Sequence, residues 1–338
     1  MVGRWTAVHT VFAIWIVVLS VLTLVVPRGD DATSAGHDRG QPRPTSPTPS
    51  PAVPTVPSTP TISSTPTAPA SVSPPPAPAL LPGGRTTIFG GQVLVAYYGT
   101  PGTNALGVLG AAPPLRIWPR LLRAANAFTA PGRRVQPVFE VIVSVAHSGP
   151  GRDGDFSADI PRAAVEPYIR AAHRLGALVV LDLQTGRSGF LSVARRWEWA
   201  LRDPWVGLAI DPEWRVYGRQ RPGHVIGHVR AGEVNRVTGW LSGLTRRLRL
   251  PQKLFVIHQF RTAMVRDPAA IRSRPNLAMV QHVDGFGTPH DKLATYHAVV
   301  RPRQFHEGFK LFYRADTRMM SPAAVLRIRP RVEFVSYQ

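Results

Sequence analysis

The sequence predicts an α/β protein whose folded part, residues 87–338, is a (β/α)8 barrel, also called a TIM barrel. From residue 90 onward, short apolar runs alternate with segments in which apolar residues recur at helical spacing. This alternation is typical of parallel β-α-β units, and eight such units match the barrel in number and length. No G-x-G-x-x-G turn follows the first run, which favours the barrel over an open, doubly wound sheet.

The N-terminal segment contains a predicted membrane span. Residues 10–26 form an uncharged apolar run that is nearly long enough to cross a bilayer as a helix. Arg4 precedes this run, and positive charge on that side keeps residues 1–9 in the cytoplasm. We expect an uncleaved signal anchor that leaves the rest of the chain outside the cytoplasm as a single-pass membrane protein. The alternative is a signal peptide whose cleavage releases a secreted protein.

Residues 27–86 are predicted to be a disordered linker. Sixteen of the 35 prolines lie between residues 27 and 82, in a stretch that is also rich in Ser and Thr. Proline fixes φ and removes backbone donors, so this segment forms an extended stalk and no core. The chain has no cysteine, which excludes disulfides, thiolate metal sites and attachment of a lipid to cysteine.

The predicted barrel strands become more polar where each one ends. They are 93–98, 137–145, 177–184, 206–214, 253–260, 278–286, 309–317 and 332–338, and helices are expected at 161–175, 190–201, 231–248 and 321–327. The active site of a barrel lies at the carboxyl ends of its strands. The polar residues at these ends are therefore the candidates for function.

The fourth predicted strand ends in two carboxylates. Period-two alternation places Gly207, Ala209, Asp211 and Glu213 on one face, and the small residues suit the barrel interior. Two neighbouring acids drive their pKa values apart, so that one stays protonated as a general acid. We predict Glu213 as the proton donor, with Asp211, or Asp182 at the end of the third strand, as the assisting carboxylate. The alternative is that these acids form structural ion pairs with arginines.

Further polar and aromatic side chains at strand ends are predicted to contact a substrate. Aromatic rings can stack on sugar rings while their polar tips form hydrogen bonds, although such residues also pack the rims of barrels. Asp284 is a further candidate acid, or alternatively part of an ordinary strand-to-loop turn. The predicted substrate contacts are Tyr97, Tyr98, Gln184, Trp214, Gln259, Gln281, Asp284 and Tyr313.

The tripeptide DPE at the end of the fourth strand resembles the D-x-E motif of family 18 chitinase-like barrels and of family 25 muramidases. In the chitinase-like pattern D-G-x-D-x-D-x-E, the sequence supplies Gly207, Asp211 and Glu213, but Val206 and Ala209 stand where that family has acids. The resemblance implies that Glu213 is the acid and that Asp211 orients an acetamido group of the substrate. The whole pattern is also similar to secreted actinobacterial barrels of the glycoside-hydrolase type.

These observations predict an extracytoplasmic glycoside hydrolase that acts on a polysaccharide or peptidoglycan glycan and needs no metal or cofactor. Histidines at strand ends suggest a metal-dependent hydrolase as an alternative, but no H-x-H or H-E-x-x-H spacing occurs. Residues 87–338 contain 35 basic and 17 acidic residues, so a non-catalytic, membrane-tethered barrel that binds an anionic wall polymer is a further alternative. No nucleic-acid-binding motif accompanies this charge, and nucleic acid is not an expected partner. The sequence indicates no particular oligomeric state.

Overall fold

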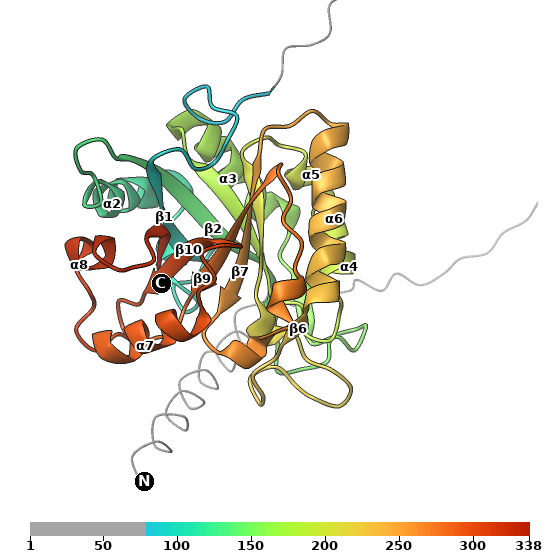
Figure 1. The fold of residues 1–338 in the computed structure, drawn as a ribbon. Helices are drawn as coiled ribbons and strands as arrows, with labels where there is room; N and C mark the ends of the chain where they lie inside the picture. Colours follow the sequence, from blue (N-terminus) through green and yellow to red (C-terminus); the bar gives the residue numbers. More distant parts are fainter. Residues whose placement is uncertain (1–78) are drawn as a thin grey trace, which may run out of the picture. The chain divides into compact units, whose positions relative to one another are not determined.

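The computed structural model describes residues 79–338, in which eight parallel strands form a closed barrel (Figure 1). The barrel strands are β1 (Gln92–Gly99), β2 (Arg134–Ala146), β4 (Leu178–Leu183), β5 (Val206–Ile210), β7 (Lys253–Gln259), β9 (Leu277–Val283), β10 (His306–Leu311) and β11 (Val332–Tyr337). Each strand pairs with the next one, and β1 pairs with both β2 and β11, which closes the sheet. The predicted (β/α)8 barrel is therefore confirmed, and each predicted strand run overlaps one of these strands.

Helices surround the barrel and cover its outer face (Figure 1). They are α2 (Pro114–Asn126), α3 (Arg162–Leu175), α4 (Phe190–Arg196), α5 (Glu198–Leu201), α6 (Ala231–Arg247), α7 (Pro289–Val299) and α8 (Pro322–Leu326). Smaller elements are β3 (Ser157–Asp159), β6 (Val229–Arg230), β8 (Val265–Arg266) and the 3-10 turns η1 (Val108–Ala111), η2 (Pro212–Trp214), η3 (Thr262–Met264) and η4 (Pro268–Ala270). Three predicted helices correspond to α3, α6 and α8, whereas the predicted helix 190–201 is divided at Trp197 into α4 and α5.

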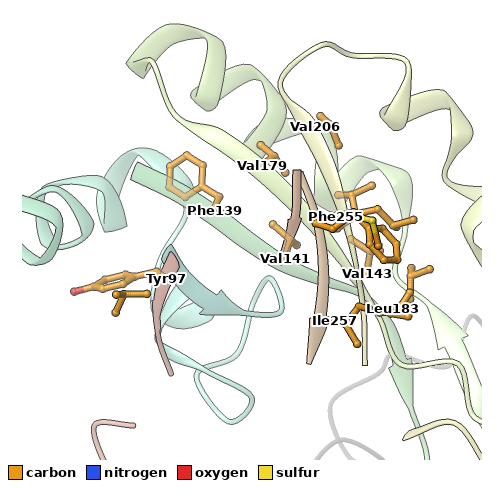
Figure 2. Close-up of a cluster of buried hydrophobic side chains, with 14 of the residues drawn as sticks. Tyr97, Phe139, Val141, Val143, Val179, Leu183, Val206, Phe255 and Ile257 are labelled. Carbon is orange, nitrogen blue, oxygen red and sulfur yellow. The ribbon is translucent and has the colours of Figure 1, made fainter. Parts of the chain in front are cut away.

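The outer face of the strands packs against the helices through a continuous apolar layer. Figure 2 shows part of it, where branched and aromatic side chains from neighbouring strands meet. The labelled members are Tyr97, Phe139, Val141, Val143, Val179, Leu183, Val206, Phe255 and Ile257. Because side chains alternate along a strand, the residues between these positions point into the barrel.

The half of the barrel interior nearest the amino ends of the strands is filled mainly by apolar side chains. A second cluster of buried residues fills it, with members from most of the strands: Leu94, Ala96, Val138, Leu178, Val180, Ala209, Leu254, Val256, Ala278, Val280 and Phe334. Leu81 and Ile88, which precede β1, belong to the same cluster. The backbone N–H of Ile88 donates to the side chain of Gln252, just before β7, so this segment lies at the amino end of the barrel. The barrel is therefore closed by side chains at this end.

The folded domain begins before residue 87, the predicted boundary. Leu81 is only 2% exposed and packs with the barrel interior, and the backbone bridges from Leu81 to Arg85. Prolines and glycines flank this short apolar segment, and for that reason the sequence predicts it to be part of the linker. No helix within residues 79–338 is long and apolar enough to cross a membrane. The predicted span 10–26 and most of the predicted linker lie outside the described residues.

Candidate active site

A cavity of about 280 Å³ opens at the carboxyl end of the barrel. All eight barrel strands contribute to it, either directly or through the loop that follows. The lining residues are Tyr98, Leu106, Ile142, Gln184, Asp211, Glu213, Trp214, Phe260, Arg261, Asp284, Gly285, Phe286, Thr295, Lys310, Phe312 and Gln338. Polar strand ends that are far apart in sequence therefore share one cavity, at the end where barrel enzymes carry their active sites.

Two of the carboxyl groups in this cavity come from the end of β5. Ala209 points into the barrel and Leu208 and Ile210 point outward, as the alternation predicts. Asp211 follows directly, and its Oδ1 accepts a hydrogen bond from the backbone N–H of Glu213 at 3.2 Å. This bond caps the turn η2, so Glu213 projects into the cavity from a turn and not from an extended strand.

Burial and neighbouring negative charge raise the pKa of both carboxyl groups. For Asp211, burial is the largest cause and Asp182 the next, and together they raise the pKa to about 8. For Glu213, burial followed by Asp211 and Asp284 holds the pKa well above its usual range. Lys310 acts in the opposite direction on both groups without cancelling these effects. Both groups therefore keep a proton to a higher pH than a solvent-exposed carboxyl group does.

A buried cluster of charged groups forms the floor of the cavity. The hydroxyl of Tyr98 donates to Oδ2 of Asp182 at 2.8 Å. The imidazole of His258 lies among three carboxylates: Nε2 is 3.2 Å from Oε1 of Glu140 and 3.9 Å from Oδ1 of Asp182, and Nδ1 is 3.2 Å from Oδ2 of Asp284. Both ring nitrogens therefore face carboxylates.

His258 is a cation in this setting. Burial opposes its charged form, and so does Lys310, but the charge of Asp182 and the hydrogen bonds to Asp284 and Glu140 outweigh both and raise the pKa of His258 to about 10. Burial is also the largest cause of the raised pKa of Asp182, and His258 opposes it. Within residues 79–338, no group of three or more His, Asp or Glu side chains is arranged to hold a metal ion. The histidine instead compensates the charge of the acids around it.

Asp284 differs from the other acids of the cavity because two cations contact it. Nζ of Lys310 lies 3.6 Å from Oδ2 of Asp284, and the same oxygen faces Nδ1 of His258. Burial would raise the pKa of Asp284, but Lys310 and the hydrogen bond with His258 together lower it. The ammonium of Lys310 also lies 3.6 Å from the centre of the Tyr98 ring, a cation–π contact that fixes its position. The cavity thus contains one acid whose pKa is lowered, Asp284, and one whose pKa is raised, Glu213.

The structure places most, but not all, of the predicted site residues at this cavity. Six line it: Tyr98, Gln184, Asp211, Glu213, Trp214 and Asp284. Asp182 lies directly beneath, bonded to Tyr98. The predicted catalytic acids and half of the predicted contacts therefore come together.

The other four predicted contacts do not line this cavity. Adjacent residues of a strand face opposite sides, so Tyr97 cannot join Tyr98; its hydroxyl donates to the backbone carbonyl of Arg120 under α2. Gln259 and Gln281 lie on the outer side of β7 and β9, where the amide of Gln281 donates to Oε1 of Gln259 at 2.8 Å. Tyr313 is also outside this cavity: it lies in the loop after β10 and lines a neighbouring hollow.

Sequence reasoning missed Glu140 and Lys310, and it considered His258 only as a metal ligand. Each of the three is a titratable residue with apolar neighbours inside a strand run, PVFEVIVSV, FKLFY and KLFVIHQF. The available signal was a charged residue within such a run, at a position that the alternation of side chains places on the inward face of the strand. Phe260, Phe286 and Phe312 come from loops, where no periodicity indicates direction.

No protein-family model matches this chain, and no curated protein matches its sequence. The likeness to glycoside hydrolases therefore rests on Gly207, Asp211 and Glu213, and on the place of the two acids at the carboxyl end of the fourth barrel strand.

Proposed function

We propose that this protein is a glycoside hydrolase that cleaves a cell-wall or other extracellular polysaccharide, with Glu213 as the proton donor. The observation that carries the proposal is that Glu213 and Asp284 line one cavity at the carboxyl end of the barrel, where the pKa of Glu213 is raised and that of Asp284 is lowered. Most glycosidases need such a pair, one acid to protonate the leaving oxygen and one carboxylate to act on the other side of the sugar.

The surrounding residues fit distinct roles in this reaction. Asp211 holds the η2 turn and so positions Glu213. Because Asp211 is itself largely protonated, it can donate a hydrogen bond to a substrate carbonyl, such as that of an acetamido group. The charge states favour Asp284 over Asp211 and Asp182 as the charged carboxylate. Trp214 and Phe312 offer aromatic surface for a sugar ring.

Exposure of the domain to extracellular polysaccharide follows from the predicted anchor. Residues 10–26 would hold the chain in the membrane and place the barrel outside the cytoplasm. Release after signal cleavage would lead to the same compartment. Glycan strands of peptidoglycan and other wall polysaccharides are the substrates available there.

The test is hydrolysis of a glycan panel by the full chain and by Glu213→Gln. The panel contains peptidoglycan, chitin oligomers and arabinogalactan. We expect cleavage of one member by the parent and a loss of roughly 10²-fold or more in the variant, because the amide cannot donate the proton in the transition state. Binding of the same glycan should persist. Glu198→Gln is the matched control. Glu198 is the first residue of α5, pairs with Arg202 and does not line the cavity.

Equal rates for parent and Glu213→Gln would contradict the proposal. Cleavage of no glycan, with retained binding to an anionic polymer, would instead favour the second candidate, a tethered binding module. The excess of basic residues in the barrel domain is the observation that supports this candidate.

A further inference from the structure

A second cavity, of about 440 Å³, adjoins the candidate active site. Loops that follow β1, β9 and β10 form its walls, together with helix α2. Phe286, Phe312 and Gln338 line both cavities, so the two hollows adjoin each other at these three residues. The second cavity is therefore the nearest neighbouring place for a further unit of a glycan chain.

The two cavities differ in the charge of their walls. Asp211, Glu213 and Asp284 line the first, whereas the lining of the second contains no Asp or Glu and has two arginines, Arg120 and Arg314. Both arginines are solvent-exposed, and neither forms an ion pair with any residue in the described part of the chain. The lining of the second cavity therefore offers two guanidinium groups to an anion and no acidic side chain.

The two arginines come from separate parts of the chain, and the backbone on which each sits is held in place. Arg120 lies on α2, and its carbonyl accepts a hydrogen bond from the Tyr97 hydroxyl at 3.1 Å. Arg314 follows Tyr313, whose backbone N–H donates to the carbonyl of Gln338 at 2.9 Å. The ring of Tyr313 stacks on Tyr337 with 5.3 Å between centres and is 44% exposed, so one aromatic surface remains open beside the arginines.

We propose that this second cavity binds a carboxylate-bearing sugar unit, so that the substrate is an acidic polysaccharide. The guanidinium group presents donors in a planar fork that matches a carboxylate, and the ring of Tyr313 can contact the apolar face of the sugar. The inference rests on the proposed function, because it names the substrate class of the same site. Its binding step can nevertheless be measured without any turnover.

The test measures binding by calorimetry to the full chain carrying Glu213→Gln, which prevents cleavage during the titration. The probes are oligomers of galacturonic acid, oligomers that contain glucuronic acid, and a peptidoglycan disaccharide with a free lactyl carboxylate, each paired with its methyl ester. Esterification removes the charge and changes the shape little. We expect at least one acid to bind about tenfold more tightly than its ester, as is typical for a charge-assisted contact.

The same measurement is repeated in Arg120→Gln/Arg314→Gln, which should abolish the preference for the acid. Arg301→Gln/Arg303→Gln removes two exposed arginines from the loop before β10, at the opposite end of the barrel, and should leave the preference intact. The inference is overturned if no acid binds, if every ester binds as tightly as its acid, or if the control double variant loses the preference equally.

Failure of this inference and failure of the proposed function give different results. Cleavage of a neutral glycan that depends on Glu213, with no preference for acids, would contradict the proposed anion-binding subsite and support the glycosidase. Binding of an acid through Arg120 and Arg314 without cleavage of any glycan would retain the subsite and reject the hydrolase.

Discussion

Lys310 and His258 are the two cations that lower the pKa of Asp284. The charge of Lys310 is the largest single stabilising contribution, and His258 acts both through its hydrogen bond and through its charge. The ammonium of Lys310 contacts the ring of Tyr98 as well as Asp284. Lys310 thus helps to keep the pKa of one acid of the cavity low while that of Glu213 is raised.

Substitution of Lys310 by Met should therefore change the pH dependence of cleavage. The pKa of Asp284 is lowered in the folded protein, so its charged form is lost only as the pH falls through that low value. Without the ammonium the pKa rises, and the acidic limb of the rate profile should move up by about 1 to 3 pH units. The measurement is the rate of glycan cleavage from pH 3 to 8.

Arg303→Gln is the control for this experiment, because it removes one positive charge from an exposed site that lines neither cavity. Its acidic limb should stay where it is in the parent. An unmoved limb in Lys310→Met would mean that Asp284 is not the charged carboxylate of the reaction.

At the level of single residues, the sequence indicated polar residues at strand ends but not the charged residues enclosed within strands. Asp211 and Asp284 come directly after β5 and β9, so topology alone carries them to the carboxyl end of the barrel. Lys310 is enclosed by apolar neighbours, and its function depends on partners from other strands, which a single strand does not indicate. Tyr97 was misplaced because its neighbour Tyr98 occupies the inward position.

Strand β10 illustrates how one element accommodates the buried polar groups of the barrel. Its pairing with β11 shifts register between Glu307 and Gly308. A side chain at residue 308 would collide with the imidazole of His282 on β9, whose Nε2 lies 2.7 Å from the Ser336 hydroxyl. Burial lowers the pKa of His282 well below its usual value, so this ring is neutral. Glycine is thus required where the histidine crosses the neighbouring strand.

We expect Gly308→Ala to lower the free energy of unfolding by about 1 to 3 kcal/mol, because the added methyl group must displace a packed ring. Gly243→Ala is the matched control: a methyl group at this position in α6 meets no atom within 4 Å. Alanine favours a helix over glycine, so the control should be unchanged or more stable by up to about 1 kcal/mol. Urea unfolding of the three proteins measures both values, and equal stability of Gly308→Ala and the parent would contradict the steric argument.

Among the helices, the sequence was informative only where an apolar stripe is clear. α3 and α6 have such a stripe and appear close to their predicted bounds. α2 begins at the second of two adjacent prolines, Pro113 and Pro114, and it also contains Pro119. Prolines of this kind resemble a loop signal, although the helix tolerates them near its first turns. The apolar residues of α7 do not gather on one side, so its period is not visible in the sequence. Packing against the strands determines these helices more than local propensity does.

For the whole molecule, the decisive feature is the closure of the sheet. β11 joins β10 to β1, so every barrel strand has two partners. The eight predicted strands were enough to suggest this architecture, because a closed parallel sheet with eight crossovers is a common solution for that pattern. The sequence could not show that the interior is apolar at the amino end and charged at the carboxyl end. This arrangement arises only when all strands are in register.

Deletion of residues 332–338 should abolish the cooperative unfolding of the domain. The deletion leaves β10 and β1 with unpaired edges and exposes interior residues such as Val256 to water. We expect the sharp thermal transition seen by circular dichroism to become broad or to vanish. Gln338→Ala, which keeps the strand, should retain it. A truncated chain that melts as sharply as the parent, at the same temperature, would show that closure is not needed.

The apolar packing at the amino end has a consequence for proton traffic. Leu81 and Ile88 pack with the apolar interior at that end, whereas Asp211, Glu213 and Asp284 line the cavity that opens at the other end. A ligand that fills this cavity would cover all three acids at once. We therefore expect their exchange of protons with solvent to slow while the ligand is bound.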